Sequence, residues 1–175
     1  GSIFAVLMSA MWLMSGVFAL EYLGHDEHEA SYQAFFMTVL SALIGQCYAG
    51  SMITLYVFYE LMTLLSFPLI LHNRSKEAIM GGLKYLFYSL FGAYLVLFGL
   101  FFLNQYTTTL NFLPGGTLNM DAVAGNETLM LVVAFAMILG FSVKAGMFPL
   151  HAWLPTAHPV APAPASAVMS GIIVK

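Results

Sequence analysis

Charged residues are scarce in this chain, and their scarcity excludes an ordinary water-soluble domain. Only 7% of the 175 residues are Asp, Glu, Lys or Arg, whereas soluble domains carry about 25%. Hydrophobic residues make up 61% of the chain, including 15 Phe and 12 Met. Water cannot solvate a surface built from such a composition, so we interpret the chain as a membrane protein.

Basic residues, cysteines and cofactor motifs are also few. The net charge is −3, and five Lys plus Arg are too few for a nucleic-acid surface. The single cysteine, Cys47, cannot form an internal disulfide. The sequence has no CxxC pair, no paired-histidine haem site and no glycine-rich dinucleotide loop, so we expect no cofactor and no metal in this chain. The apolar start lacks the basic region of a signal peptide, and we expect the chain to be part of a longer protein.

Hydropathy predicts an all-α, polytopic transmembrane helix bundle. A spanning helix needs roughly 20 mostly apolar residues. The run 34–71 is too long for one span, and we divide it at Ala49-Gly50-Ser51. A loop rich in Gly, Pro and Asn covers 104–128. The other predicted spans are 3–22, 78–103, 129–150 and the start of a sixth at 165–175.

Two basic residues set the predicted orientation. Arg74 and Lys76 lie in the short connection "HNRSKEA", whereas the 104–128 loop has no Lys or Arg. The positive-inside rule then places "HNRSKEA" in the cytoplasm and the long loop outside. Parity places the acidic "HDEHE" loop and the "HAWLPTAHPVAPAP" connection inside as well. We therefore predict a multi-pass protein of the cell (inner or cytoplasmic) membrane.

A proline-rich segment separates the fifth and sixth spans. Proline removes a backbone donor and clashes with the preceding turn, so no continuous helix can pass through "FPLHAWLPTAHPVAPAPA". Non-helical backbone at membrane depth is tolerated where it lines a wet cavity or is buried in protein, and ion pathways use such broken helices. The alternative is an ordinary cytoplasmic loop. The prolines are Pro149, Pro155, Pro159, Pro162 and Pro164.

Four ionisable side chains lie inside the predicted spans: Glu60, Lys84, Lys144 and Lys175. A charge at the bilayer centre costs about 2.5–3.5 kcal/mol on insertion scales, so such residues need partners, water or a function. Glu60 and Lys144 have opposite sign and similar depth, and an interhelical pair would lower both penalties. Lys84 is near enough to the inner end of its span to extend its ammonium to the interface instead.

The histidines allow more than one interpretation. His151 and His158 flank the tryptophan of "PLHAWLPTAHP" and could extend a proton path, because imidazole titrates near neutral pH. A structural role, bonded to loose backbone, is the alternative. His25 and His28 share a helical face in "HDEHE", and we favour a solvated polar loop over a metal site there.

The stretch "GFSVKAGMFPLHAWLPTAHPVAPAPASAVMSGIIVK" resembles the antiporter-like membrane subunits. This family is shared by respiratory complex I, membrane-bound hydrogenases and multisubunit cation/proton antiporters. Upstream, "TLYVFYELM" is similar to the glutamate-bearing helix of the family and "GGLKYLFYS" to the next helix. The resemblance covers residues 30–175. One departure is Thr156, where many relatives carry aspartate.

The resemblance implies roles for individual residues. Glu60 matches the glutamate that modulates the central lysine, and Lys144 matches that pumping lysine on the broken helix. Lys175 matches the lysine that connects it onward, and Lys84 matches a further lysine of several members. His151 and His158 remain candidates for an extended relay.

The resemblance also implies an organisation and a function. Residues 1–30 would form a first transmembrane helix with an acidic loop, and 31–175 the first five-helix repeat of an antiporter-like subunit, its last helix incomplete. We expect translocation of protons, or of sodium, by a non-redox subunit of a complex of NADH-quinone oxidoreductase or hydrogenase type. Its partners would be other membrane subunits and lipid, with no nucleic acid. The sequence leaves open whether the chain belongs to an enzyme.

Two other functions fit the same residues. One is a subunit of a gradient-driven multisubunit cation/proton antiporter without a redox partner. The other is a membrane scaffold whose buried pairs are inert. The scaffold predicts that Glu60→Gln leaves ion transport untouched.

Overall fold

The computed structural model describes residues 1–174, and this part of the chain is built from helices and their connections. The all-α fold class is thereby confirmed. The helices are α1 (Ser2–Tyr22), α2 (Glu29–Cys47), α3 (Met52–Ile70), α4 (Lys76–Tyr106), α5 (Met120–Val123), α6 (Glu127–Lys144), α7 (Leu154–Ala157), α8 (Ala163–Val168) and the π-helix Met169–Ile173.

The predicted spans correspond to the long helices. The run 34–71 is divided into α2 and α3, and Ser51 begins α3 because its side chain accepts a hydrogen bond from the Thr54 N–H. Among residues 1–174, α1, α3, α4 and α6 are long and apolar enough to cross a membrane. Helix α2 has 19 residues but is more polar, and it packs between α1 and α3. Pro68 lies inside α3, which continues to Ile70.

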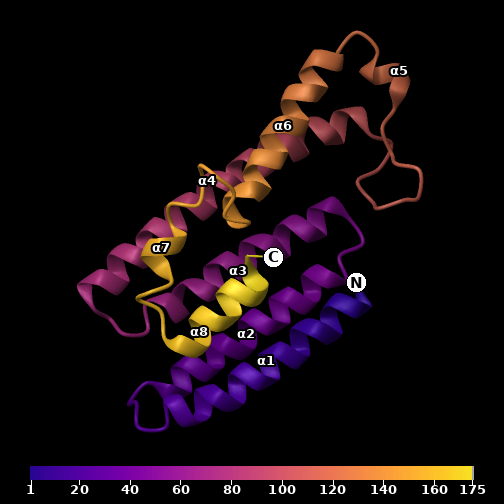
Figure 1. Ribbon diagram of the computed structural model, residues 1–175. Coiled ribbons are helices and arrows are strands. Elements are labelled where there is room, and N and C mark those ends of the chain that lie inside the picture. Colours follow the sequence, from indigo (N-terminus) through magenta and orange to yellow (C-terminus); the bar gives the residue numbers. More distant parts are fainter. Residues whose placement is uncertain (175) are drawn as a thin grey trace.

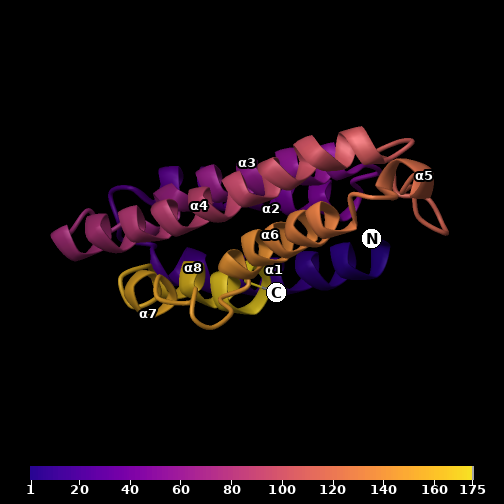
Figure 2. The ribbon, with the colours of Figure 1, turned by 90° about the horizontal axis from the view of Figure 1, so that it is seen from above.

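The helices form two adjoining groups. Helices α1, α2 and α3 run side by side, while α4 packs on α3 and α6 lies along α4 (Figures 1 and 2). The yellow α8 packs back against α1, where the Ser15 hydroxyl donates to the Pro164 carbonyl at 3.0 Å. Large apolar side chains such as Phe87 and Leu131 are exposed on the outer faces, as lipid contact requires.

The connections gather at the two ends of the bundle as the orientation argument predicts. At one end, the α1–α2 loop and the α7–α8 link both contact the α3–α4 turn. At the other end, the long loop pairs with the α2–α3 turn, where the Phe112 N–H donates to the Gly50 carbonyl. Which end faces the cytoplasm stays a prediction.

Helix α6 ends at Lys144, so the predicted span 129–150 is six residues too long. The prolines that follow are not what ends the helix at Lys144. Gly146 adopts a left-handed conformation (φ 66°), its N–H donates to the Val143 carbonyl, and the Met147 N–H donates to the Ser142 carbonyl. These are the two hydrogen bonds of a Schellman cap, which ends a helix before any proline is reached.

Close packing of α4 against α6 determines how far into the bundle the C-terminal end of α6 lies. A Cβ on Gly92 would lie 2.6 Å from the Gly140 carbonyl oxygen, so only glycine allows the two backbones to approach this closely. Because Gly92 is near the middle of the 31-residue α4, α6 terminates within the bundle rather than at its surface (Figure 2).

Candidate functional site

Lys144 lies at the terminus of α6 and is only 3% exposed. Its ammonium donates a hydrogen bond to the Thr63 hydroxyl of α3. It also lies 4.9 Å from the centre of the Tyr59 ring and 5.6 Å from that of Tyr85. Aromatic faces attract a cation at these distances, and the negative end of the helix dipole at a C-terminus favours positive charge as well. The nearest partners of the ammonium are therefore neutral groups.

Glu60 does not form the expected ion pair in this structure. Its carboxylate oxygens lie more than 4.0 Å from the Lys144 ammonium nitrogen. One carboxylate oxygen of Glu60, Oε1, is enclosed and has no hydrogen-bond partner among residues 1–174. Thr63 lies one turn further along α3 and holds the ammonium instead. The two acceptors share a helix face because they are three residues apart.

A cluster of buried hydroxyls surrounds this contact. The Thr63 hydroxyl donates to the Tyr59 carbonyl, which leaves its oxygen lone pairs for the lysine. Ser66 donates to the Thr63 carbonyl, and its hydroxyl lies 2.7 Å from that of Tyr85. Ser89, one turn along α4 from Tyr85, has a buried hydroxyl without a partner among residues 1–174. The cluster joins α3 to α4 beneath the end of α6.

The proline-rich segment is fixed to the α6 terminus by Trp153. This side chain is fully buried, and its Nε1–H donates to the Val143 carbonyl at 2.9 Å. The same carbonyl also accepts from the Gly146 N–H, so Trp153 adds a second donor to the cap of α6. The Trp153 ring also packs against Tyr85 at 5.1 Å between centres. The segment thus closes one side of the lysine site.

Lys84 is half-buried on α4 and is directed towards α7. Its ammonium donates to the Thr156 hydroxyl at 2.9 Å. Neither Glu60 nor Lys144 is among its hydrogen-bond partners within residues 1–174. Lys84 thus links α4 to the broken segment through Thr156, and its part in translocation stays a prediction.

The two histidines of the broken segment lie apart from the lysine contact. His158 Nδ1 is 3.0 Å from the Ser166 hydroxyl, and its ring stacks on Trp153 with the centres 6.4 Å apart. His151 packs against Phe148, and its Nδ1 is buried without a partner among residues 1–174. Lys175 lies outside the described residues, so its place in the site stays a prediction.

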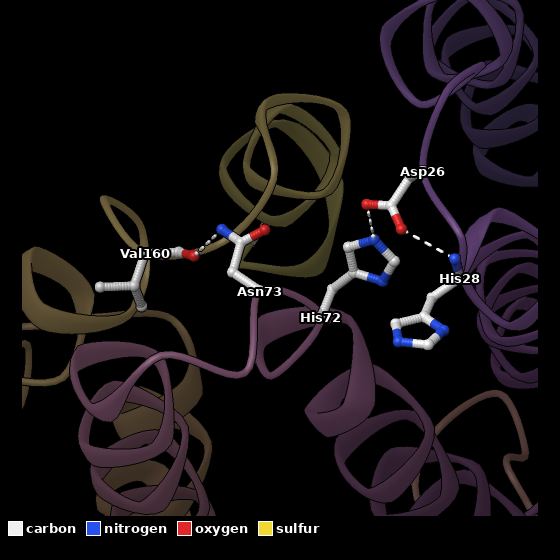
Figure 3. Close-up of polar contacts among 5 residues, drawn as sticks. All are labelled: Asp26, His28, His72, Asn73 and Val160. Carbon is white, nitrogen blue, oxygen red and sulfur yellow. Dashed lines mark hydrogen bonds and ion pairs between the residues drawn. The ribbon is translucent and has the colours of Figure 1, made fainter.

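Polar contacts join three connections at the end that holds the predicted inner loops (Figure 3). His72 Nε2 is 3.0 Å from the Asp26 carboxylate, and the Asn73 amide donates to the Val160 carbonyl at 3.0 Å. The other Asp26 oxygen accepts from the His28 N–H. That N–H and the His72 ring lower the pKa of Asp26 below its ordinary value. The groups that meet at this end are polar, and Asp26 is exposed.

Sequence reasoning found the ionisable residues and missed the hydroxyls. Glu60, Thr63 and Ser66 recur every three residues on α3, and Tyr85 and Ser89 are four apart on α4. These spacings place each set on one helix face. The spacing of the hydroxyls could have indicated the cluster. It is a weak indication, because a hydroxyl in an apolar helix often bonds only to the backbone of its own helix.

Curated relatives resemble the chain over nearly its whole length. It is 32% identical to "Hydrogenase-4 component B" of Escherichia coli over 99% of the chain, and 31% identical to "NADH-quinone oxidoreductase subunit N" of Desulforudis audaxviator over 97%. It is 27% identical to a Na(+)/H(+) antiporter subunit of Bacillus subtilis over 99%. The chain spans 26%, 34% and 35% of these proteins, about a quarter to a third of their length.

Two solved structures share the fold. The membrane-bound sulfane sulfur reductase, described as an archaeal respiratory membrane complex, contains a chain with a TM-score of 0.76 at 26% identity. The Mrp complex from Dietzia sp. DQ12-45-1b contains one with a TM-score of 0.74 at 21% identity. Each match covers 98% of this chain, and 35% and 32% of the respective solved chain.

The family comparison covers most of the sequence. Residues 49–175 match the family described as "NADH:quinone oxidoreductase/Mrp antiporter, TM". The matched region contains Glu60, Lys84, Lys144 and the broken helix. The chain therefore belongs to the NADH:quinone oxidoreductase/Mrp antiporter transmembrane family, whose members are antiporter-like membrane subunits.

Proposed function

We propose that the chain translocates protons, or sodium ions, as part of the antiporter-like subunit of a redox-driven membrane complex. The observation that supports this most directly is the enclosed Lys144 at the end of a broken helix, with the Glu60 carboxylate on the neighbouring helix more than 4.0 Å away. Burying an ammonium within the membrane costs free energy, and ionisable residues in such places usually have a function.

The mechanism uses two positions of the ammonium. When Lys144 is close to Glu60, the carboxylate compensates its charge and the lysine holds its proton. When charge arriving from a neighbouring subunit separates the two groups, the ammonium loses that compensation and releases its proton more readily. The proton then moves towards Lys175. Lys84, His151 and His158 would lie on branches of the same path.

The chain would supply one half of a channel. We propose that residues 31–175 form the first five-helix repeat of the subunit and 1–30 the preceding helix with its loop. The curated relatives are about three to four times as long as this chain, which leaves room for a second repeat. Its partners would be the other membrane subunits of the complex.

A gradient-driven cation/proton antiporter is the second candidate. The similarity to the Bacillus subtilis antiporter protein and to the Mrp complex favours it, while the hydrogenase component and the archaeal respiratory complex favour the redox-driven assembly. Purifying the native complex separates them. Iron–sulfur or nickel–iron subunits support the first, and small membrane subunits alone support the second.

Substitution of the two central residues tests translocation itself. We expect Glu60→Gln and Lys144→Ala, made in the complete subunit, to slow ion uptake by about tenfold or more, which corresponds to about 1.4 kcal/mol in the barrier. Uptake is measured in vesicles that contain the purified complex, with a pH-sensitive dye inside.

Thr38→Val is the matched control, because the Thr38 hydroxyl is exposed on α2 and donates only to the Ala34 carbonyl of its own helix. It should transport normally. Normal transport by both Glu60→Gln and Lys144→Ala would refute the function and leave an inert scaffold.

A further inference from the structure

We propose that Thr63 is a positioning residue that provides a second, neutral acceptor for the Lys144 ammonium, and that the ammonium alternates between Thr63 and Glu60 during transport. This inference rests on the proposed function. The structure holds the ammonium on Thr63, and the Glu60 oxygen that faces the interior is without a partner among residues 1–174. The arrangement is therefore that of the separated pair.

In this structure the ammonium is bound to one of the two acceptors, Thr63, and lies more than 4.0 Å from the oxygens of the other, Glu60. Glu60 and Thr63 are three residues apart on α3, so their Cβ atoms lie about 5–6 Å apart on one face. The flexible side chain of lysine can cover this distance without a movement of either helix. A small displacement of its tip would take the ammonium from the hydroxyl to the carboxylate.

A hydroxyl suits the second position because it stabilises the ammonium without neutralising it. Thr63 already donates its own proton to the Tyr59 carbonyl, and its lone pairs are therefore directed away from that bond and towards the lysine. The rings of Tyr59 and Tyr85 add attraction for the cation. Removal of the hydroxyl would leave the ammonium with the rings alone in the separated state.

Ser66 and Tyr85 keep this second position in place. The Ser66 hydroxyl is 2.7 Å from that of Tyr85, and this contact fixes the ring of Tyr85 from α4 against α3. Both side chains are fully buried. The second position is therefore a built feature of the α3–α4 interface and not an accident of one rotamer.

Thr63→Val tests the proposal, because valine keeps the shape of threonine and removes the hydroxyl. In the complete subunit within its complex, reconstituted in vesicles, we expect ion uptake to slow by about tenfold, as losing a hydrogen bond to a charged group does. Thr63→Ser, which keeps the hydroxyl, should restore uptake to within about twofold of the unchanged protein on the same reasoning.

Ser142→Ala is the matched control. Ser142 is buried on α6 two residues before Lys144, but its hydroxyl donates to the Ile138 carbonyl of its own helix. It should pump normally. Thr63→Ala is tested beside Thr63→Val, so that a packing defect of one replacement is not mistaken for loss of the hydroxyl, and the amount of assembled complex is measured for each.

The outcomes distinguish this inference from the proposed function. Slow uptake in Thr63→Val and Thr63→Ala, with recovery in Thr63→Ser, supports the second acceptor. Normal uptake in Thr63→Val, or equal loss in Thr63→Ser, refutes it. If Glu60→Gln and Lys144→Ala pump normally, the proposed function fails, whatever Thr63 does. If those two fail to pump and Thr63→Val pumps, only the second acceptor is wrong.

Discussion

The centre of the bundle and its loop end treat charge in opposite ways. At the loop end, Asp26 is partly exposed, and its carboxylate lies 3.0 Å from His72 Nε2 (Figure 3). At the centre, Lys144 is enclosed and rests on a hydroxyl and two rings, while its carboxylate partner stands off. Where solvent is absent, the low dielectric strengthens the attraction between opposite charges and also raises the free-energy cost of a charge that has no partner. The contrast indicates that the centre is adapted for change and the loop end for holding connections together.

The largest expected effect comes from breaking the centre at Gly146. Gly146→Ala should disturb the chain reversal after Lys144, since a left-handed conformation costs a residue with a side chain about 1–2 kcal/mol and the tip of the Leu154 side chain would have to move to admit the new Cβ. We expect loss of ion uptake together with a lower unfolding temperature of the purified complex.

Gly116→Ala provides the control for that experiment. Gly116 also has a positive φ, of 85°, but a Cβ there would meet open space in the long loop. It carries the conformational cost without the overlap, so stability should fall slightly and transport should persist. Equal loss of transport in both variants would contradict a special role for the α6 terminus.

A substitution between the two regions, at the contact in which Lys84 donates to Thr156, should have an intermediate effect on stability and ion uptake. Thr156→Val removes this acceptor. Because Lys84 is half-buried, its ammonium can bond to water instead, which recovers part of the lost stabilisation. We expect stability to fall by about 1 kcal/mol and uptake to fall less than in Thr63→Val. Thr156→Ser should behave as the unchanged protein, and a loss in Thr156→Val as large as that in Thr63→Val would show that the centre extends to Lys84.

The smallest effect is expected at the loop end. Because the pKa of Asp26 is lowered in the folded state from its ordinary 3.8, the carboxylate stabilises the fold above that ordinary value, and the contribution is lost as pH falls through the lowered value. Asp26→Asn should lower the unfolding temperature slightly at neutral pH and leave transport unchanged.

The difference from the unchanged protein should vanish in strong acid and shrink at high salt. Glu27→Gln, which alters a neighbouring exposed carboxylate, is the control and should have less effect. A large loss of transport in Asp26→Asn would contradict the division between the two regions.

The fold was largely predictable because a membrane imposes a simple rule. Runs of about 20 apolar residues had to be helices, since the hydrocarbon offers no partner for exposed backbone groups. The division of 34–71 into α2 and α3 followed from Ala49-Gly50-Ser51. The end of α6 was misplaced, because prolines are conspicuous in the sequence and the glycine that makes a Schellman cap is not.

Of the candidate site, only the ionisable residues could be predicted from the sequence. Glu60 and Lys144 are visible because ionisable residues stand out in an apolar run. Their contacts could not be read from the sequence, since the Lys144–Thr63 bond joins residues 81 positions apart and the Lys84–Thr156 bond residues 72 apart. Helix packing decides which hydroxyl faces a lysine, and the choice of Thr63 over Glu60 is a result of the fold.

The length of α4 has a consequence for the surrounding lipid. Its 31 residues extend about 46 Å at 1.5 Å per residue, whereas the hydrocarbon slab is about 30 Å thick. Even the steepest tilt seen among spanning helices, about 40°, shortens its projection to no less than about 35 Å. Either part of α4 therefore projects beyond the slab, or the bilayer beside the exposed Phe87 and Leu97 thickens locally to cover the helix.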